Sequence, residues 1–430
     1  MTQPVRVGLL GCGTVGEATA RILIEHADDI LRRAGAPVEL ARVAVKDTSK
    51  PRGIDLPAAS LTSDARAVVH DPNIDVVVEA IGGIEPAREL ILAAFASRKP
   101  VVTANKELLS THGQEVMDAA DKADVDFLFE ASVGGGIPII RPLKESLAGD
   151  RVTRVMGILN GTTNFILTRM SDSGGSFAEA LEESERLGYT ELDPSADIDG
   201  YDAAAKLAIL ASIAFNARVI ASDVHREGIS KVSARDITAA HELGYEIKLL
   251  GVAETDGGAI TARVYPAMLP QTHPLAAVRG VFNAVFVEGQ ESGELMFFGR
   301  GAGGGPTGSA VVGDVVEVAR NLSTGGKAVG CTCDGYAKLR PQEETPARYY
   351  IVLSVADRPG VLSEVAGVFA EHDISIASVR QEGKGDEATL VAITHTASEG
   401  QHQATFAGLS GLRAVKSVDS TLRVEGTGER

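Results

Sequence analysis

A short acidic segment near the middle of the chain ends in a lysine. It runs from Gly188 to Lys206, reads GYTELDPSADIDGYDAAAK, and carries carboxylates at Glu191, Asp193, Asp197, Asp199 and Asp202. If a helix begins near Asp199, then Asp202 and Lys206 lie four positions apart and face the same side of it. On a surface helix this would be an ordinary ion pair, worth about 0.3–0.5 kcal/mol.

The residues around Lys206 favour a less exposed environment. Three alanines precede it and Leu-Ala-Ile-Leu follows it, so the lysine is expected to be partly buried. Asp202 would then hold its ammonium group towards a cleft, where a lysine can have a shifted proton affinity and serve as a general acid. The residues alone leave this interpretation and the surface ion pair equally open.

A second lysine, Lys106, follows Asn105 directly after the apolar run at 100–104. Ligands of open α/β sheets bind at the carboxyl ends of the strands. Lys106 is therefore well placed to reach a cofactor or a substrate. A lysine that only caps a strand is the alternative.

A glycine loop occupies the N-terminal end of the chain. Gly11-Cys12-Gly13-Thr14-Val15-Gly16 matches G-x-G-x-x-G between the apolar run at 5–10 and a helical pattern. The first glycine permits a tight turn, the second lets the backbone approach a pyrophosphate, and the third allows close packing of helix and strand. The loop predicts a bound NADP or NAD.

The preferred dinucleotide stays open. At the end of the second apolar run, Lys46 could meet a 2′-phosphate and Asp47 a 2′-hydroxyl. Both could equally be solvated charges at the end of a strand.

The elements that position these residues follow from hydrophobic patterning. Apolar runs at 5–10, 38–45, 75–80, 100–104 and 126–130 alternate with helix-like stretches, which predicts a Rossmann-type parallel sheet over 1–136. Residues 137–335 mix helical and strand-like patterns and predict an α+β catalytic and dimerisation domain. A polar linker at 336–348 and a ferredoxin-like βαββαβ unit at 349–430 follow. The glycine-dense stretch at 299–307 predicts tight turns or close backbone approach rather than a packed element.

Composition excludes several classes of protein. The formal net charge of −17 argues against binding to nucleic acid or to an anionic membrane. Neither a secretory leader nor a run of 18 apolar residues is visible, so the expected compartment is the cytoplasm. Three cysteines, Cys12, Cys331 and Cys333, are too few for a disulfide framework, and Cys331-x-Cys333 lacks the further ligands of a metal site.

Taken together, these stretches resemble homoserine dehydrogenase. The similar segments include GLLGCGTVG, VVTANKELL, EASVGGGIPII, GILNGTTNFIL, the acidic segment ending in Lys206, and GRGAGGGPTGSAVVGDV, in the family's order. The resemblance implies reversible, NADP- or NAD-dependent conversion of L-aspartate 4-semialdehyde to L-homoserine, in the biosynthesis of threonine, methionine and isoleucine.

The resemblance also implies roles for single residues. Lys206 would be the acid/base residue, and Lys106 would lie beside both nicotinamide and substrate. The remaining substrate and cofactor contacts would be Glu191 and Asp202 on the substrate's amino group, Thr162 and Gly188 in the same pocket, and Gly303 on the cofactor. A monovalent cation, Na⁺ or K⁺, would lie near Glu130 and the carbonyls of Val133, Gly135 and Ile137.

The C-terminal unit resembles an ACT domain. Its loop Asp357-Arg358-Pro359-Gly360-Val361-Leu362 lies between the first predicted strand and helix. ACT domains commonly bind an amino acid where two of them pair, so feedback inhibition by threonine is expected, with a docking module as the alternative. Pairing also favours a homodimer or homotetramer.

Two other functions are alternatives to this one. A phosphorylating aldehyde dehydrogenase needs a nucleophilic cysteine in its substrate domain. Cys12 lies in the glycine loop, and Cys331 and Cys333 lie beyond the catalytic segments. In a non-catalytic amino-acid sensor, the intact Lys106 and Lys206 would have no purpose.

Overall fold

The computed structural model describes residues 3–56, 60–190, 193–333, 335–383 and 388–426. The chain divides into two compact units whose segments interleave along the sequence. The first unit comprises residues 1–161, 202–224 and 281–337, and the second comprises residues 162–201, 225–280 and 338–430. The predicted domain boundaries at 136, 335 and 348 remain predictions.

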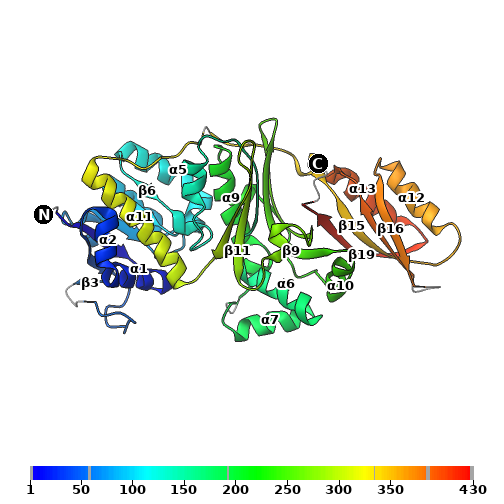
Figure 1. The fold of residues 1–430 in the computed structure, drawn as a ribbon, viewed down its shortest axis with the longest axis horizontal. Helices are drawn as coiled ribbons and strands as arrows, with labels where there is room; N and C mark the ends of the chain where they lie inside the picture. Colours follow the sequence, from blue (N-terminus) through cyan, green and yellow to red (C-terminus); the bar gives the residue numbers. More distant parts are fainter. Residues whose placement is uncertain (1–2, 57–59, 191–192, 334, 384–387, 427–430) are drawn as a thin grey trace. The chain divides into compact units, whose positions relative to one another are not determined.

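A six-stranded parallel sheet forms the framework of the first unit (Figure 1). Its strand order is β3-β2-β1-β4-β5-β6, the doubly wound order of dinucleotide-binding folds. The strands are β1 (Val5–Leu10), β2 (Val38–Ala44), β3 (Leu61–Thr62), β4 (Val76–Glu79), β5 (Val101–Thr103) and β6 (Phe127–Leu128). The predicted Rossmann-type parallel sheet is confirmed.

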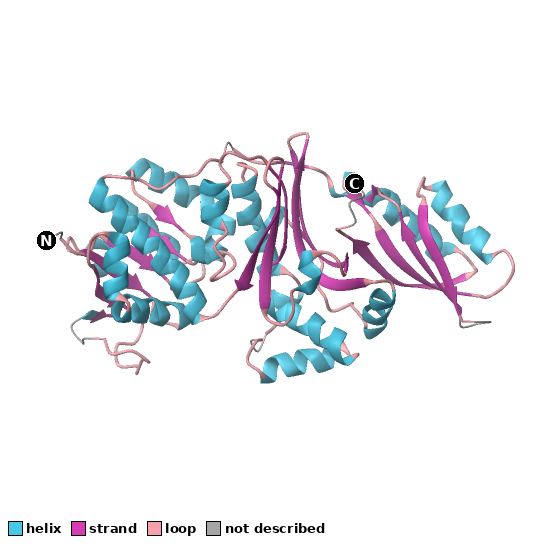
Figure 2. Ribbon diagram, in the orientation of Figure 1, coloured by secondary structure: helices cyan, strands magenta, loops and turns pink. Residues whose placement is uncertain are grey.

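Helices cover this sheet, because its central strands are apolar on both faces. Leu9 and Leu10 of β1 and Val77 and Val78 of β4 are adjacent pairs that point to opposite faces, and all four are fully buried, as expected of strands that lie between two helical layers. Figure 2 shows the strands between helices. The helices are α1 (Thr14–Glu25), α2 (Ala27–Ala34), α3 (Ala65–His70), α4 (Ala87–Ala96), α5 (Lys106–Ala123) and α11 (Gly304–Thr324).

Three antiparallel strands and a buried helix complete the first unit. The strands β7 (Val152–Ile158), β11 (Phe282–Gly289) and β12 (Gly293–Arg300) pair in the order β12-β11-β7. Helix α9 (Tyr201–Ala214) consists almost entirely of alanine, leucine and isoleucine between Ala203 and Ala214. These residues are buried on nearly every side of the helix, as expected of a helix inside a core.

Besides its C-terminal part, the described residues of the second unit form a long hairpin and four α-helices. Strands β9 (Tyr245–Asp256) and β10 (Ala259–Pro270) form the hairpin. The helices are α6 (Gly161–Ser173), α7 (Phe177–Arg186), α8 (Ser195–Ile198) and α10 (Ala234–Glu242). Two-residue strands lie at β8 (His225–Arg226), β13 (Lys338–Leu339), β14 (Pro346–Ala347) and β18 (Ala397–Ser398).

The C-terminal part of the second unit has the predicted βαββαβ order. Its elements are β15 (Tyr349–Val355), α12 (Val361–Glu371), β16 (Ile376–Glu382), β17 (Ala388–Thr394), α13 (Glu399–Gly411) and β19 (Val415–Val424). The strands pair in the order β19-β15-β17-β16. Helices α12 and α13 lie on one side of them, where Val365, Phe369 and Leu409 join Ile351 and Leu353 in one core (Figure 2). The predicted ferredoxin-like unit is confirmed.

Two segments differ from what their composition suggests. Residues 338–339 and 346–347 of the predicted linker are paired with β10 and β18, because backbone pairing does not require apolar side chains. The glycine-dense stretch does more than turn. Its last residues begin α11, and a Cβ atom on Gly304 would lie 2.9 Å from the Thr14 carbonyl oxygen, so these glycines let α11 pack closely on α1.

None of the helices in the described ranges has both the length and the apolar character needed to cross a bilayer.

Candidate active site

The glycine loop connects β1 to α1, and its three glycines have different environments. Gly11 has a φ of +93°, and a Cβ atom there would lie 2.6 Å from the Ala80 carbonyl oxygen. On Gly16 it would lie 2.2 Å from the Gly11 carbonyl oxygen, whereas Gly13 has open space around it. Packing therefore requires the first and third glycines. The second leaves room for a phosphate beside the uncapped amides at the start of α1.

The turn after β2 adds a residue that the sequence reasoning missed. Asp47 accepts hydrogen bonds from the amide and hydroxyl of Ser49, which lower its pKa, and Lys46 is exposed. Arg52 folds back over this turn and donates to the Asp47 carbonyl oxygen at 2.6 Å and to the Lys50 carbonyl oxygen at 2.8 Å. Burial raises the pKa of Cys12, and the guanidinium of Arg52 partly offsets this rise. Arg52 therefore lies beside the glycine loop. The sequence signal was an arginine just beyond the second strand.

Lys106 is positioned by the carboxyl ends of β4 and β5. Glu79 is fully buried at the end of β4 and accepts hydrogen bonds from the Ile81 and Gly82 amides and from the Thr103 hydroxyl. Asn105 then caps α5, with its Oδ1 accepting from the Leu108 amide at 3.1 Å and its Nδ2 donating to the Gly83 carbonyl oxygen at 2.6 Å. These bonds fix Lys106 as the first residue of α5.

Lys206 and Asp202 form the predicted pair on α9, and both are buried. Lys206 is 8% exposed, and its Nζ donates to Asp202 Oδ2 at 2.7 Å and to the Leu159 carbonyl oxygen at 2.8 Å. The side chains of both residues are only 10% exposed. A solvated surface pair is therefore excluded.

Asp202 also binds Lys106, which the spacing of the sequence did not reveal. Lys106 Nζ lies 3.1 Å from Asp202 Oδ1, and Asn160 Nδ2 donates to Asp202 Oδ2 at 2.9 Å. Burial by itself would raise the pKa of Asp202, but the two lysines and Asn160 outweigh it and hold the pKa well below its usual value. One carboxylate thus joins two ammonium groups.

This arrangement can deliver a proton at a fixed place. Two of the three N–H directions of Lys206 are occupied by Asp202 and Leu159, and the third can donate to a substrate oxygen. The Lys106 side chain remains 37% exposed. Two ammonium groups near the carboxyl edge of a dinucleotide-binding sheet suit a reaction that creates negative charge on oxygen.

Sequence comparisons match three consecutive family models to the chain. These are the homoserine dehydrogenase NAD-binding domain at residues 11–130, homoserine dehydrogenase at 138–316, and the ACT domain at 349–405. A homoserine dehydrogenase of Corynebacterium glutamicum is 49% identical over 426 residues, covering 98% of this chain and 96% of that protein. One from Mycobacterium tuberculosis is 50% identical and covers 99% of both chains. The chain belongs to the homoserine dehydrogenase family.

Solved homoserine dehydrogenases share the fold. A crystal structure from Thiobacillus denitrificans is 40% identical, covers 99% of both chains and has a TM-score of 0.92. A Staphylococcus aureus structure at pH 8.5 is 31% identical with a TM-score of 0.80, covering 99% of this chain and all of that one. The chain is accordingly an NAD(P)-dependent oxidoreductase, and neither alternative function is supported.

The other residues singled out for a homoserine dehydrogenase lie in several places. Gly303, with a φ of +109°, caps α11 in the first unit, next to Gly304 and its approach to Thr14. Thr162 and Gly188 belong to the second unit, where the Thr162 hydroxyl donates to the Tyr189 carbonyl oxygen at 2.9 Å. Glu191 lies outside the described residues.

The segment around Glu130 has the donor set of a hard cation. Glu130 is 7% exposed and accepts hydrogen bonds from the amides of Ile139, Ile140 and Arg141. The three carbonyls singled out for a cation, those of Val133, Gly135 and Ile137, accept no hydrogen bond from any described residue. One carboxylate and three carbonyl oxygens fit Na⁺ or K⁺. The described part of the chain contains no group of three acidic, histidine or cysteine side chains that could hold a metal ion.

Proposed function

We propose that Lys206 and Lys106 carry the chemistry of this homoserine dehydrogenase in the interconversion of L-aspartate 4-semialdehyde and L-homoserine. The observation that carries the proposal is the buried carboxylate of Asp202, which binds Lys206 at 2.7 Å and Lys106 at 3.1 Å. A purely structural ion pair requires only one of these lysines.

Lys206 donates the proton and Lys106 assists it. The bound nicotinamide supplies the hydride that reaches the aldehyde carbon. As negative charge develops on the aldehyde oxygen, the remaining N–H of Lys206 donates to that atom and transfers its proton. Asp202 orients the lysine before the reaction. In the reverse direction the neutral amine of Lys206 removes the hydroxyl proton.

The substrate's amino group is recognised by carboxylates. Asp202 and Glu191 are proposed to bind it, with Thr162 and Gly188 lining the same pocket. The resemblance to the family supports all four assignments. For Asp202 there is further support, because its carboxylate stays ionised and three bonds leave one of its roughly four acceptor sites open.

NADP is proposed as the preferred cofactor. The exposed Lys46 and the arginine at position 52 both lie where a 2′-phosphate would be placed after β2. Asp47, the acceptor for a 2′-hydroxyl, is already bonded to Ser49. A hyperthermophilic archaeal homoserine dehydrogenase solved in complex with NADPH has the same fold, at 26% identity and a TM-score of 0.63.

A monovalent cation, Na⁺ or K⁺, is proposed to bind at Glu130 and the carbonyls of Val133, Gly135 and Ile137. Its support is the donor set. The segment is anchored by Asp314, which is 1% exposed and whose Oδ2 accepts a hydrogen bond from the Glu130 amide. The role is structural, since the cation would hold the glycine turn at 134–136 in place.

Threonine is proposed to inhibit the enzyme through the ACT domain. The loop before α12 has the typical ACT sequence, and Asp357 accepts a hydrogen bond from Gln381 of β16 at 3.0 Å. Threonine should lower activity and raise the melting temperature, whereas allo-threonine should do neither. If threonine changes neither quantity, the ACT domain serves docking alone.

Pairing of subunits and a cytoplasmic location complete the proposal. The end strand β12 exposes Met296 and Phe298, at 36% and 55%, which suits a homodimer or homotetramer. Three unpaired thiols suit a reducing cytoplasm.

The reaction itself is tested with the purified protein. It should oxidise NADPH when L-aspartate 4-semialdehyde is added and reduce NADP⁺ with L-homoserine, and neither rate should depend on phosphate. Turnover that requires phosphate, or the absence of turnover with both cofactors, would contradict the proposal.

A further inference from the structure

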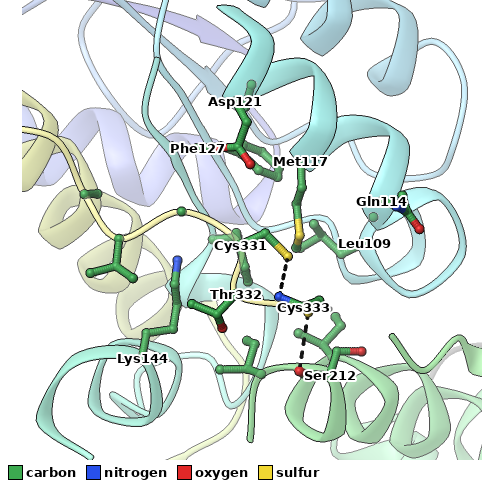
Figure 3. A pocket seen from close by; sticks show the side chains of 18 of the residues that line it. Leu109, Gln114, Met117, Asp121, Phe127, Lys144, Ser212, Cys331, Thr332 and Cys333 are labelled. Atoms are coloured by element: carbon green, nitrogen blue, oxygen red, sulfur yellow. Dashed lines mark hydrogen bonds between the residues drawn. The ribbon is translucent and has the colours of Figure 1, made fainter. Parts of the chain in front are cut away.

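A pocket separate from the glycine loop and the lysine pair lies within the first unit (Figure 3). Helix α5, helix α9 and the segment after α11 surround it, and its space, including the part that opens to solvent, is about 860 Å³. Most of its wall is apolar and includes Leu109, Met117, Phe127, Ile209, Ile213 and Val219. Its lining suits the apolar body of a small molecule.

Two thiols face this pocket. Cys331 and Cys333 are both unpaired and partly buried. The Cys333 amide donates to Cys331 Sγ at 3.4 Å, and the Cys333 thiol donates to the Ser212 carbonyl oxygen at 3.5 Å. Figure 3 shows the Cys331 sulfur on the α5 side, near Met117, and the Cys333 sulfur towards Ser212. Neither thiol takes part in the dehydrogenase reaction.

Cations line the same pocket. Arg218 is 7% exposed, and its buried Nη1 has no hydrogen-bond partner among the described residues. Lys144 lies over the Phe129 ring, 5.5 Å from its centroid. The other charged groups in the lining are Asp121, Asp126 and Lys327. Asp126 is already bonded to the Ala328 amide and Asn321, while Lys327 binds Asp124.

These surroundings make one thiol the better nucleophile. The neighbouring Cys333, whose amide donates to Cys331 Sγ, lowers the pKa of Cys331 against the effect of burial and with the help of Arg218. The pKa of Cys333 is raised by its neighbour Cys331 and by burial. Cys331 is therefore the more readily ionised of the two thiols. A metal cation does not suit the site, because Arg218 and Lys144 repel it and the two thiols have no third ligand among the described residues.

We propose that this pocket is a thiol-modification site, in which Cys331 attacks a small disulfide that carries a carboxylate on an apolar body. The apolar wall would hold the body, and Arg218 Nη1 and Lys144 would bind the carboxylate. Cys333 is the resolving thiol. The pocket adds a second chemistry to the chain and does not depend on the roles of Lys106 and Lys206.

The reaction balances as two thiol–disulfide exchanges. The Cys331 thiolate forms a bond to one sulfur of the small disulfide, whose S–S bond breaks and releases one thiolate with the electron pair. Cys333 then loses its proton to solvent and attacks Cys331 Sγ, which releases the second thiolate. The protein gains a Cys331–Cys333 disulfide and loses two electrons, and the small disulfide is reduced to two thiols.

Dithiobis(nitrobenzoate) tests the site on the full-length enzyme, since it is an aromatic disulfide with a carboxylate on each ring. At about pH 6.5, where an ordinary thiol of pKa ~8.5 is about 1% ionised, wild type should release two coloured thiolates per chain. Cys333→Ser should release one and keep a mixed disulfide on Cys331, identified by mass spectrometry. Cys331→Ser should release none, and Cys12→Ser should behave as wild type.

The rate of the first step separates this site from an ordinary exposed thiol. The rate-versus-pH profile is measured on wild type, which keeps both thiols, and its midpoint is expected below the ~8.5 of an ordinary thiol. Arg218→Gln should slow dithiobis(nitrobenzoate) about tenfold more than it slows uncharged dithiodipyridine, as expected on losing one charge-assisted bond. The uncharged probe corrects for any change in the thiolate itself.

Several results would overturn the proposal. A Cys331→Ser variant that reacts as fast as wild type would move the chemistry elsewhere, and a midpoint above pH 8 would make Cys331 an ordinary thiol. Equal slowing of both probes by Arg218→Gln would remove the carboxylate site. Release of one thiolate by wild type would remove Cys333 as the resolving residue. Unchanged dehydrogenase activity of Cys331→Ser shows that this variant is folded.

Discussion

Replacing Asp202 by asparagine removes the negative charge that joins the two lysines. At an effective dielectric constant of ~20, opposite charges about 4 Å apart attract by about 4 kcal/mol, and desolvation offsets part of this. Breaking a buried pair while one charge stays buried costs about 3–5 kcal/mol. Lys206 is 8% exposed, and in this variant its ammonium group would keep its hydrogen bond to the Leu159 carbonyl oxygen but lose its charged partner. We therefore expect Asp202→Asn to lose about 3 kcal/mol in free energy of unfolding.

Activity should fall as well, because Lys206 loses the group that orients it. A loss in kcat of about 100-fold is expected, the size typical of one misplaced donor at a developing oxyanion. The assays are urea unfolding and steady-state reduction of L-aspartate 4-semialdehyde. Asp124→Asn is the matched control, since its bond to Lys327 is largely exposed and should contribute little to stability.

The pH dependence of this difference has a defined sign. The folded-state pKa of Asp202 is depressed, so its contribution to stability is present above the unfolded pKa of about 3.9 and is lost as the pH falls through the folded value. The difference in free energy of unfolding between wild type and Asp202→Asn should thus begin to shrink as the pH falls below ~4. If Asp202→Asn keeps both the stability and the kcat of wild type at pH 7, the reasoning about the shared carboxylate is refuted.

Three further predictions concern the cation, the cofactor and a buried lysine. Replacing Na⁺ and K⁺ by a bulky organic cation should lower the melting temperature of wild type but not that of Glu130→Gln, because a cation at a hundredfold excess over Kd stabilises the folded state by about 2.7 kcal/mol. Equal melting temperatures of wild type in all salts would exclude the site. Arg52→Gln should lower kcat/KM for NADPH about tenfold and leave that for NADH within about twofold, and an equal loss for both would exclude a 2′-phosphate contact. Burial lowers the pKa of Lys248 to about 8, so its contribution to stability is lost as the pH falls through 8. Urea titrations should therefore show the free energy of unfolding of wild type rising relative to that of Lys248→Met between pH 8 and 10. A constant difference between the two proteins over this range would contradict the shift.

Local periodicity predicted much of the fold and half of the site. The alternation of apolar runs and helices predicted the parallel sheet, and the four-residue spacing predicted the bond between Asp202 and Lys206. Both features depend on residues that are close in the sequence. The environment of Lys206 followed from its apolar neighbours, since a helix rich in alanine and leucine has to be buried.

What the sequence could not predict depends on contacts between distant segments. Lys106 binds Asp202 only because the start of α5 meets α9 in the folded unit, and no spacing encodes that distance. Arg52 folds back over Asp47 through a turn without a regular pattern. The spacing of Cys331 and Cys333 argues only against a metal site and does not indicate a pocket. Their pocket exists because α5, α9 and the segment after α11 come together.

The central claim is that Lys206 transfers the proton, and single-site kinetics on Lys206→Ala test it most directly. With L-aspartate 4-semialdehyde and NADPH, kcat should fall about 1,000-fold, within the range of general acid catalysis, while the Kd for NADPH stays within about twofold of wild type. Lys122→Ala, an exposed lysine on α5, should leave both values unchanged. Turnover of Lys206→Ala near that of wild type would contradict the account.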